Sequence, residues 1–450
     1  MMKFSKWLFG TLLLSTHGFS QADSELLHQL AEAPSAERIE LDIQKLVSFG
    51  TRHTLSDTRS EVRGIGAARR WIEAEFNRIA EACDGCLQVY TQSQVFSEQP
   101  RIPNATEVVN VVAILPGTSD PNRFVIMSGD IDSRVTDPLN GIDDSPGAND
   151  NASGMAGVIE AARVLSQHQF PASIIFVGLS GEEQGLFGGK IMAEQALKDG
   201  WHIEAILNND MIGNISGING VTNNTTARVF SEATRPIETD REARIRRFTG
   251  GEVDSPSRNI ARYIDTIADR YIRNLDVMMV YRLDRFGRGG HHRPFNEVGF
   301  PGVRIMETNE HYDRQHQDIR VEGGRPFGDT IDGVDFEYAA KMTALNVVSL
   351  ASMALAPAPP EQVTIEGMVS PDTTLKWRKV AGAHHYKIYW RLTTEPQWQW
   401  SRQAGDVAEF TLENVVIDNY IFGVASVSKA GIESPVVFPG PIGAFWKVDD

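Results

Sequence analysis

Cysteine is scarce in this chain, which has only Cys83 and Cys86 in 450 residues. Two thiols cannot make a zinc site with four sulfur ligands. Their stretch, Cys-Asp-Gly-Cys, has a spacing that in a cytosolic protein indicates redox chemistry or metal binding. In an exported protein the same pair is more typical of a structural disulfide, and this is the interpretation we favour.

Basic residues are outnumbered, with 43 Lys and Arg against 59 Asp and Glu, a formal net charge of -16. Phosphate backbones are bound by clustered Lys and Arg, so we expect no nucleic-acid partner. The excess of carboxylates leaves some of them available as ligands for cations.

Long apolar runs are also missing, and the run near the start, Trp7 to Ser15, is too short to span a bilayer. Lys3 and Lys6 precede it, and Ser20 to Ala22 offers small residues for cleavage. This pattern predicts a signal peptide over residues 1–22, a secreted or periplasmic protein, and no transmembrane segment after signal removal. A buried first helix is the alternative, which the polar residues that follow disfavour.

Residues 23–355 alternate short apolar strands with amphipathic helices, which predicts an α/β domain with a mixed central sheet flanked by helices. A chain of this length is expected to hold more than one folded unit. The segment from Arg241 to Arg288 is rich in charge and is expected to form helices and loops. The strands are expected at Val108–Leu115, Phe124–Met127, Ser173–Leu179, Ile203–Leu207 and Val303–Met306, and the helices at Gly64–Ala80, Ser153–Ser166, Leu186–Lys198 and Tyr338–Ala354.

Prolines at 356–360 predict a stiff linker between two separately packed cores. Beyond it, residues 361–450 alternate apolar and polar residues with a period of two, which predicts an all-β sandwich of the immunoglobulin type. The pieces LKW, HHYKIYWR and NYIFGVASVSKAGIESP resemble a fibronectin type III domain. This resemblance covers most of the stretch from Glu361 to Pro441.

Five acidic or histidine-bearing segments fall at or just past the ends of predicted strands. In open α/β sheets, ligands bind at the carboxyl ends of strands. Taken alone, each segment has an ordinary explanation: a surface turn at Asp130 and Asp132, or a helix cap by Asp150 or Ser153. The adjacent Glu182 and Glu183, the single Asp210 and the polar stretch His311 to Gln317 complete the set. Together they indicate a metal-binding site, because clustered carboxylates need a compensating charge.

The ordered segments SGDIDS, GANDNASG, SGEEQG, NNDMIG and RQHQD resemble the co-catalytic zinc aminopeptidases, metallopeptidase family 28, over roughly Val108 to Ala354. The resemblance implies the zinc exopeptidase fold, peptide substrates and two zinc ions bridged by Asp150. It implies that Asp210 binds one ion and Glu183 the other, and that Glu182 is the general base. Asp132 would contact the ligand residues and not the metal ions.

Two positions depart from the family pattern. Asp130 stands where most members have the histidine of a His-x-Asp segment, so the first metal would gain an oxygen ligand. Gln315 stands where a tyrosine usually precedes the late histidine ligand. We favour His316 over His311 as that ligand, on its match in the stretch QHQD. The role of Gly290-His291-His292 stays open.

Two divalent cations lower the pKa of a bound water, and Glu182 would accept its proton and pass it to the leaving amine. The resemblance also implies that one metal holds the α-amine of the substrate. An exported aminopeptidase is therefore the favoured function. A carboxypeptidase or amidase of the same fold, and an inactive binding protein with a decayed site, are the alternatives. The sequence gives no indication of the oligomeric state.

Overall fold

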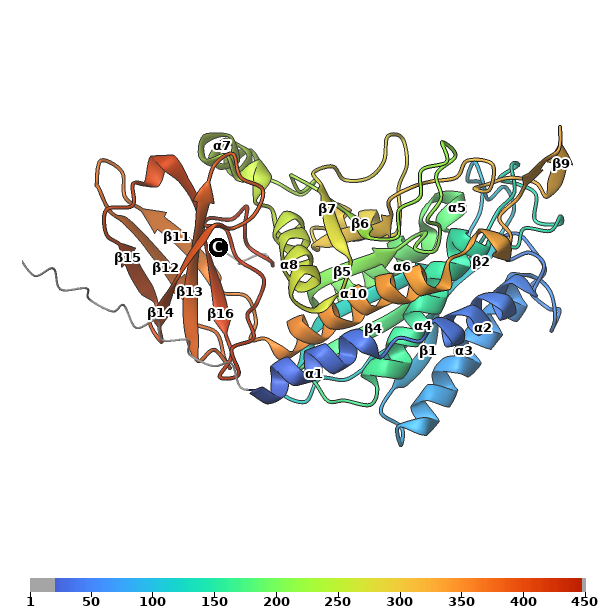
Figure 1. The fold of residues 1–450 in the computed structure, drawn as a ribbon, viewed down its shortest axis with the longest axis horizontal. Coiled ribbons are helices and arrows are strands. Elements are labelled where there is room, and N and C mark those ends of the chain that lie inside the picture. Colours follow the sequence, from blue (N-terminus) through green and yellow to red (C-terminus); the bar gives the residue numbers. More distant parts are fainter. Residues whose placement is uncertain (1–20, 447–450) are drawn as a thin grey trace, which may run out of the picture.

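The computed structural model describes residues 21–446, and an eight-stranded mixed sheet organises most of the chain before residue 360 (Figure 1). Its strands are β1 Gln88–Phe96, β2 Thr106–Leu115, β3 Asp120–Asp130, β4 Ala172–Leu179, β5 His202–Asn209, β6 Thr226–Ser231, β7 Asp276–Val280 and β8 Gly302–Glu307. They lie in the order β1-β2-β4-β3-β5-β8-β6-β7. The four central strands β4, β3, β5 and β8 run parallel, while β1, β2 and the pairing of β6 with β8 are antiparallel.

Helices cover both faces of the sheet, and the central strands are apolar on both faces for this reason. In β4, Ile174 and Phe176 belong to one buried cluster, while Ile175 and Val177 belong to the other. The first cluster packs against α1 Gln21–Glu32, α2 Ala36–Val47, α3 Gly64–Ala82, α4 Gly154–Leu165, α8 Pro256–Tyr271 and α10 Phe336–Leu355. The second packs against α6 Phe187–Lys198 and α9 His292–Glu297.

The remaining elements of this part are short. They are α5 Glu182–Gly185, α7 Asp240–Thr249, the small hairpin β9 Arg320–Glu322 with β10 Arg325–Phe327, the irregular helical turn η1 Ala148–Ser153, and the turns η2 Gly251–Val253 and η3 Ile331–Gly333. One helix of the described part, α10, is long and apolar enough to cross a membrane by length and composition. Its contacts with α1, α4 and α8 bury it within the protein, which accounts for its apolar sequence.

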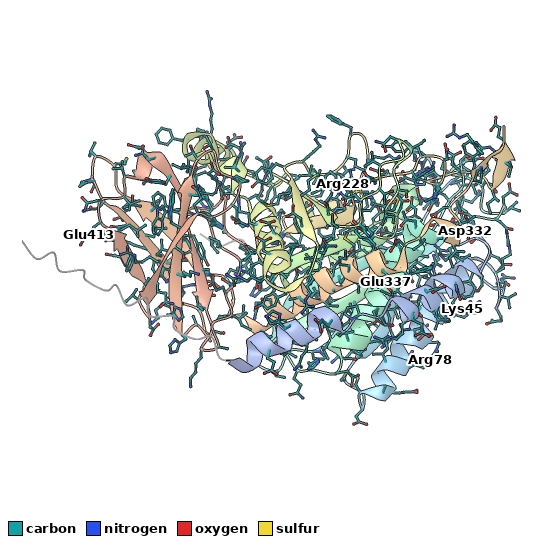
Figure 2. The ribbon with its side chains drawn as sticks, viewed as in Figure 1. Lys45, Arg78, Arg228, Asp332, Glu337 and Glu413 are labelled. Atoms are coloured by element: carbon teal, nitrogen blue, oxygen red, sulfur yellow. A yellow bond between two sulfur atoms is a disulfide. The ribbon has the colours of Figure 1, made fainter. Side chains whose placement is uncertain are left out.

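The C-terminal part holds two antiparallel three-stranded sheets, in the orders β11-β12-β15 and β14-β13-β16. Their elements are β11 Glu361–Glu366, β12 Thr373–Arg378, β13 His385–Leu392, β14 Trp400–Gly405, β15 Glu409–Leu412, the turn η4 Ile417–Asn419 and β16 Tyr420–Val427. Trp377 and Tyr386 are buried and in contact with each other, with ring centroids 5.2 Å apart. Charged side chains such as Glu413 lie on the outside (Figure 2).

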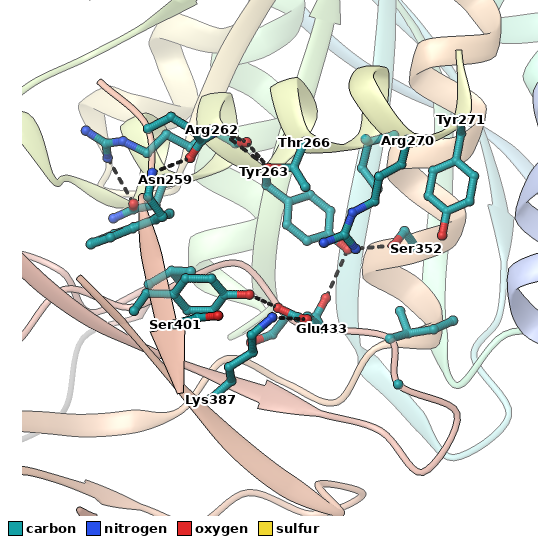
Figure 3. Close-up of a pocket in the computed structure, with 18 of the residues that line it drawn as sticks. Asn259, Arg262, Tyr263, Thr266, Arg270, Tyr271, Ser352, Lys387, Ser401 and Glu433 are labelled. Atoms are coloured by element: carbon teal, nitrogen blue, oxygen red, sulfur yellow. Dashed lines mark hydrogen bonds and ion pairs between the residues drawn. The ribbon is translucent and has the colours of Figure 1, made fainter. Parts of the chain in front are cut away.

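The C-terminal sheets pack directly against α8, and a buried charge network joins the two parts. Asp254 accepts from Arg262 at 3.0 Å and from Arg391 of β13 at 2.6 Å, and all three side chains are almost fully buried. Figure 3 shows the adjoining interface, where the hydroxyl of Tyr263 in α8 donates to the backbone carbonyl of Glu433 at 3.0 Å. A cavity of about 260 Å³ remains there.

The fold confirms the predicted α/β class with its mixed sheet and the all-β part that follows it. Each predicted strand and helix overlaps an observed one. Cys83 and Cys86 form the expected disulfide. The predicted signal peptide lies almost entirely in residues 1–20, outside the described residues.

The expectation of two separately packed cores is wrong. Side chains of the C-terminal sheets and of α1, α8 and α10 belong to one continuous buried cluster. The proline-rich segment 356–360 is itself mostly buried, and the backbone carbonyl of Ala358 accepts a hydrogen bond from the Ser426 hydroxyl at 2.7 Å. Its prolines stop α10 but do not hold the two parts away from each other.

Candidate metal centre

The polar segments found in the sequence meet at one edge of the sheet, where the parallel strands end. Asp130 is the last residue of β3, Asp210 directly follows β5, and Glu182 and Glu183 begin α5 shortly after β4. Parallel strands bring their carboxyl ends to a common edge, so residues distant in sequence become neighbours.

Loops carry two further residues to this edge. Asp150 lies in η1, ahead of α4, and His316 lies in the loop between β8 and β9. His316 has a φ of +54°, in the left-handed region that non-glycine residues seldom adopt. Such backbone persists only where the surrounding structure holds it.

Asp150, Glu183 and His316 form a compact group with the composition of a metal site. One ligand atom from each lies within 4.8 Å of the others. The Nε2 atom of His316 is 2.9 Å from Oδ2 of Asp150 and 2.9 Å from Oε1 of Glu183. Glu183 is buried, whereas His316 keeps 22% of its side-chain surface exposed, so the group is open to solvent on one side.

The charges in this group respond to one another. Burial alone would lower the pKa of His316, but the carboxylates of Glu183 and Asp150 raise it to about 9. Burial alone would raise the pKa of Asp150, but the hydrogen bond and charge of His316 hold it well below its usual range. The two carboxylates therefore attract a cation to the position that the imidazole ring faces.

Glu182 lies beside this group but outside it. Burial raises the pKa of its carboxyl well above the usual range, and the charges of Glu183 and Asp210 raise it further. A carboxyl whose pKa is raised in this way accepts a proton more readily than an ordinary carboxylate, which suits it to acid–base catalysis.

Asp132 holds the Glu182–Glu183 dipeptide in place. Its carboxylate accepts the backbone N–H of Glu182 at 3.2 Å and that of Glu183 at 3.1 Å. The Thr54 hydroxyl donates to it at 3.2 Å. Asp132 itself is buried, so it acts on the orientation of both glutamates and does not reach solvent.

Asp329 holds the Asp150 loop in a similar way. Its carboxylate accepts the backbone N–H of Asp150 at 2.6 Å and that of Asn149 at 2.9 Å. From the other side, Arg52 donates to the carbonyls of Pro146 and Gly147 at 2.5 and 2.9 Å. These contacts fix the segment that carries Asp150.

Asp130 and Asp210 are placed differently from the other predicted ligands. The carboxylate of Asp130 is 2.6 Å from Nδ1 of His291 and accepts from Nδ2 of Asn151 at 2.7 Å. The carboxylate of Asp210 pairs with Arg304 at 2.8 Å. Within residues 21–446, neither residue belongs to a convergent group of three ligand atoms.

Sequence reasoning missed the residues that act on the site from elsewhere in the chain. Asp329, Arg52 and Arg304 lie in segments without a recognisable motif, and their partners are mostly backbone groups or distant side chains. The sequence assigns no role to His291, and the fold pairs it with Asp130, 161 residues away. The available signal was the charge of Arg304 among the apolar residues Val303, Ile305 and Met306 of β8.

The group formed by Asp150, Glu183 and His316 fits zinc. Two carboxylates and one imidazole are ligands that zinc accepts, and three protein ligands leave a position for water or substrate, as in catalytic zinc sites. The fold and this group together define an α/β protein with a candidate hydrolytic metal centre.

Comparisons with known proteins agree with this class. The model of peptidase family M28 matches residues 110–321. A probable zinc metalloprotease of Pyrenophora teres f. teres is 41% identical over 426 residues, covering 94% of this chain and 88% of that protein. Another, from Leptosphaeria maculans, is 42% identical over 423 residues, covering 93% and 98%. The chain belongs to peptidase family M28.

A solved structure shows the same fold at lower sequence similarity. The LapA aminopeptidase of Legionella pneumophila superposes with a TM-score of 0.53 and 18% identity, covering 78% of this chain and 77% of that one.

Proposed function

We propose that this chain is a zinc-dependent exopeptidase that removes N-terminal residues from peptides. The observation that carries the proposal is the convergence of Asp150, Glu183 and His316, with Glu182 beside them. Membership of a peptidase family supports peptide-bond hydrolysis as the reaction.

In this proposal each acidic residue has one task. Zinc held by Asp150, Glu183 and His316 supplies a Lewis acid that lowers the pKa of water. Glu182 takes a proton from the attacking water and returns it to the leaving amine. Asp132 keeps Glu182 in position by accepting its backbone N–H.

The preference for N-terminal residues is inferred from the ordered motifs, which resemble those of co-catalytic zinc aminopeptidases. LapA, an aminopeptidase, has the same fold, which is compatible with this inference. The resemblance also implies a second zinc ion on Asp130, Asp150 and Asp210, but these three carboxylates do not converge, and no step above uses a second ion.

We also propose that residues 1–22 direct export and that residues 361–450 form a fibronectin type III-like domain. The signal-like composition supports the first proposal. Two antiparallel sheets, with a buried Trp377 and Tyr386 in contact, support the second.

A panel of aminoacyl chromogenic amides, assayed with and without a chelator, tests the reaction. We expect cleavage of amides with a free α-amine, loss of activity with chelator, and recovery on adding zinc. N-acetylated amides are the matched control, and peptides with a blocked N-terminus and free C-terminus test a carboxypeptidase. Equal cleavage of the acetylated amides would contradict the aminopeptidase proposal, and chelator-resistant activity would contradict the zinc mechanism.

A further inference from the structure

We propose that this chain binds one zinc ion at its active site and that the guanidinium of Arg304 takes the place of a second ion. The inference rests on the proposed function, because it takes Asp150, Glu183 and His316 as the zinc ligands. It departs from the two ions that the family resemblance implies.

The first argument is convergence. Zinc binds oxygen and nitrogen ligands at about 2.0 to 2.2 Å, so two ligand atoms of one tetrahedral ion lie roughly 3.4 Å apart. Asp150, Glu183 and His316 meet this condition closely, with two contacts of 2.9 Å. In the described part of the chain, Asp130 and Asp210 do not join Asp150 in a second such group, even within the looser limit of 4.8 Å.

The second argument is that Asp210 already has a cation. Arg304 is fully buried and lies in β8, the strand beside β5. One guanidinium nitrogen is 2.8 Å from Oδ2 of Asp210, and the other donates to the carboxylate of Asp284 at 3.1 Å and to the carbonyl of Gly289 at 2.5 Å.

Arginine keeps its positive charge at every physiological pH. Here, ion pairs with Asp210 and Asp284 fix the position of the Arg304 guanidinium. Moving it away to admit an ion would remove the closer of the two arginines that pair with the buried Asp284, and would leave only Arg285, at 3.4 Å. Weakening a buried ion pair in this way is unfavourable. A divalent ion at the Asp210 carboxylate would also stand next to a fixed positive charge. Arg304, a residue of the sheet, therefore compensates the charge of Asp210 in place of a second ion.

The third argument is that the carboxylate of Asp130 is already engaged by other side chains. It stands where most of the family has a histidine, yet its two oxygens contact Nδ1 of His291 and Nδ2 of Asn151. The other ring nitrogen of His291 is buried and has no hydrogen-bond partner among residues 21–446. It belongs to no ligand group there, so it does not replace the missing ligand in this arrangement.

Metal counting on the full-length protein tests the proposal directly. The protein is stripped with a chelator, dialysed against zinc and analysed by elemental mass spectrometry. We expect one equivalent in the wild type, one in Asp130→Asn and in His291→Ala, and none in Glu183→Gln. Manganese substitution gives an independent reading, since one isolated ion shows an uncoupled paramagnetic resonance spectrum and two ions sharing a carboxylate show a coupled one.

Each outcome has a distinct meaning. Two equivalents with one lost in Asp130→Asn or His291→Ala would overturn the single-ion proposal while leaving the proposed function intact. No metal in the wild type, or full metal in Glu183→Gln, would overturn both. A second, weak equivalent that disappears in Asp269→Asn belongs to the group of Asp265, Asp269 and Asp276, which is separate from the active site, and leaves one ion at the active site.

Discussion

Glu182 and Glu183 are neighbours in sequence, but their surroundings give them different chemistry. Glu183 points to His316 at 2.9 Å and lies 3.7 Å from Arg134, so cationic groups compensate its charge. Among residues 21–446, Glu182 has no ion-pair partner, and burial raises the pKa of its carboxyl. One glutamate is thus suited to hold a metal ion and the other to carry a proton.

Replacing Glu182 by glutamine should remove turnover without removing the metal. The amide keeps the shape of the side chain but cannot accept a proton, and general-base catalysis contributes about 100- to 10,000-fold. Rate and zinc content are measured together on a cleavable aminoacyl amide. Glu194→Gln, the same change on the exposed side of α6, is the control. A Glu182→Gln rate above a tenth of the wild-type rate would show that another group is the base.

Replacing Asp132 by alanine should weaken zinc binding although Asp132 is not proposed as a ligand. The change leaves the backbone N–H groups of Glu182 and Glu183 without their acceptor, at a cost of about 1 to 3 kcal/mol in unfolding free energy. Loss of such supporting contacts lowers metal affinity by about 10- to 100-fold. Zinc titration and urea unfolding measure the two effects.

Asp137→Ala provides a matched control for this variant. Asp137 is exposed, and it too accepts a backbone N–H, from Leu139 at 2.9 Å. We expect little change in zinc affinity there. Equal zinc affinities in Asp132→Ala and the wild type would show that Asp132 does not position the glutamates for zinc binding.

At the scale of the element, the end of strand β6 carries a buried carboxyl group, that of Glu232. Glu232 follows β6 directly and is 5% exposed. Burial raises the pKa of its carboxyl to about 8, although Arg235 and Arg258 act to lower it. The folded state therefore holds a proton there that the unfolded chain releases near pH 4.5.

This proton gives a prediction for stability against pH. A carboxyl with a raised folded-state pKa contributes its full stability below the unfolded value and loses it as pH rises through the folded value. Glu232→Gln should thus become more stable relative to the wild type between pH 5 and 8, by up to about 1.4 kcal/mol per pH unit. Urea unfolding at several pH values measures the difference. Glu413→Gln, an exposed change, is the control, and a pH-independent difference would contradict the prediction.

The elements show what the sequence could predict and what it could not. Apolar runs such as Ser173 to Leu179 predicted the buried strands, because a parallel strand covered on both faces must be apolar throughout. The motifs then placed Asp150, Glu183 and His316 near one edge. Arg304 and Asp329 escaped prediction because their roles depend on contacts with Asp210 and with the Asp150 backbone, which only the fold brings near.

At the scale of the whole molecule, the C-terminal sheets are part of the folded core. Ending the chain near Pro357 would remove Arg391 from the buried network of Asp254 and Arg262 and expose apolar surface. Breaking a buried charge network typically costs about 3 to 5 kcal/mol. We therefore expect the truncated chain to be poorly soluble or to melt well below the full-length protein, contrary to what the proline-rich segment alone predicted.

Soluble yield and thermal unfolding followed by circular dichroism measure the effect of this truncation. Arg391→Met in the full-length chain isolates the charge network from the loss of apolar contacts. A soluble truncated chain that melts cooperatively near the full-length temperature would show that the first part folds without the C-terminal sheets.

The three residues of the zinc group come from distant parts of the chain, and this has a thermodynamic consequence. Asp150, Glu183 and His316 come together only in the native state, so an unfolded chain has no comparable site for the ion. By mass action, zinc then favours the folded state, by about 2.7 kcal/mol when its free concentration is a hundred times the dissociation constant. The melting temperature should fall on chelation and rise with added zinc, and Glu183→Gln should be insensitive to both. Availability of the ion would in this way govern how long the folded enzyme persists, separately from how fast it works.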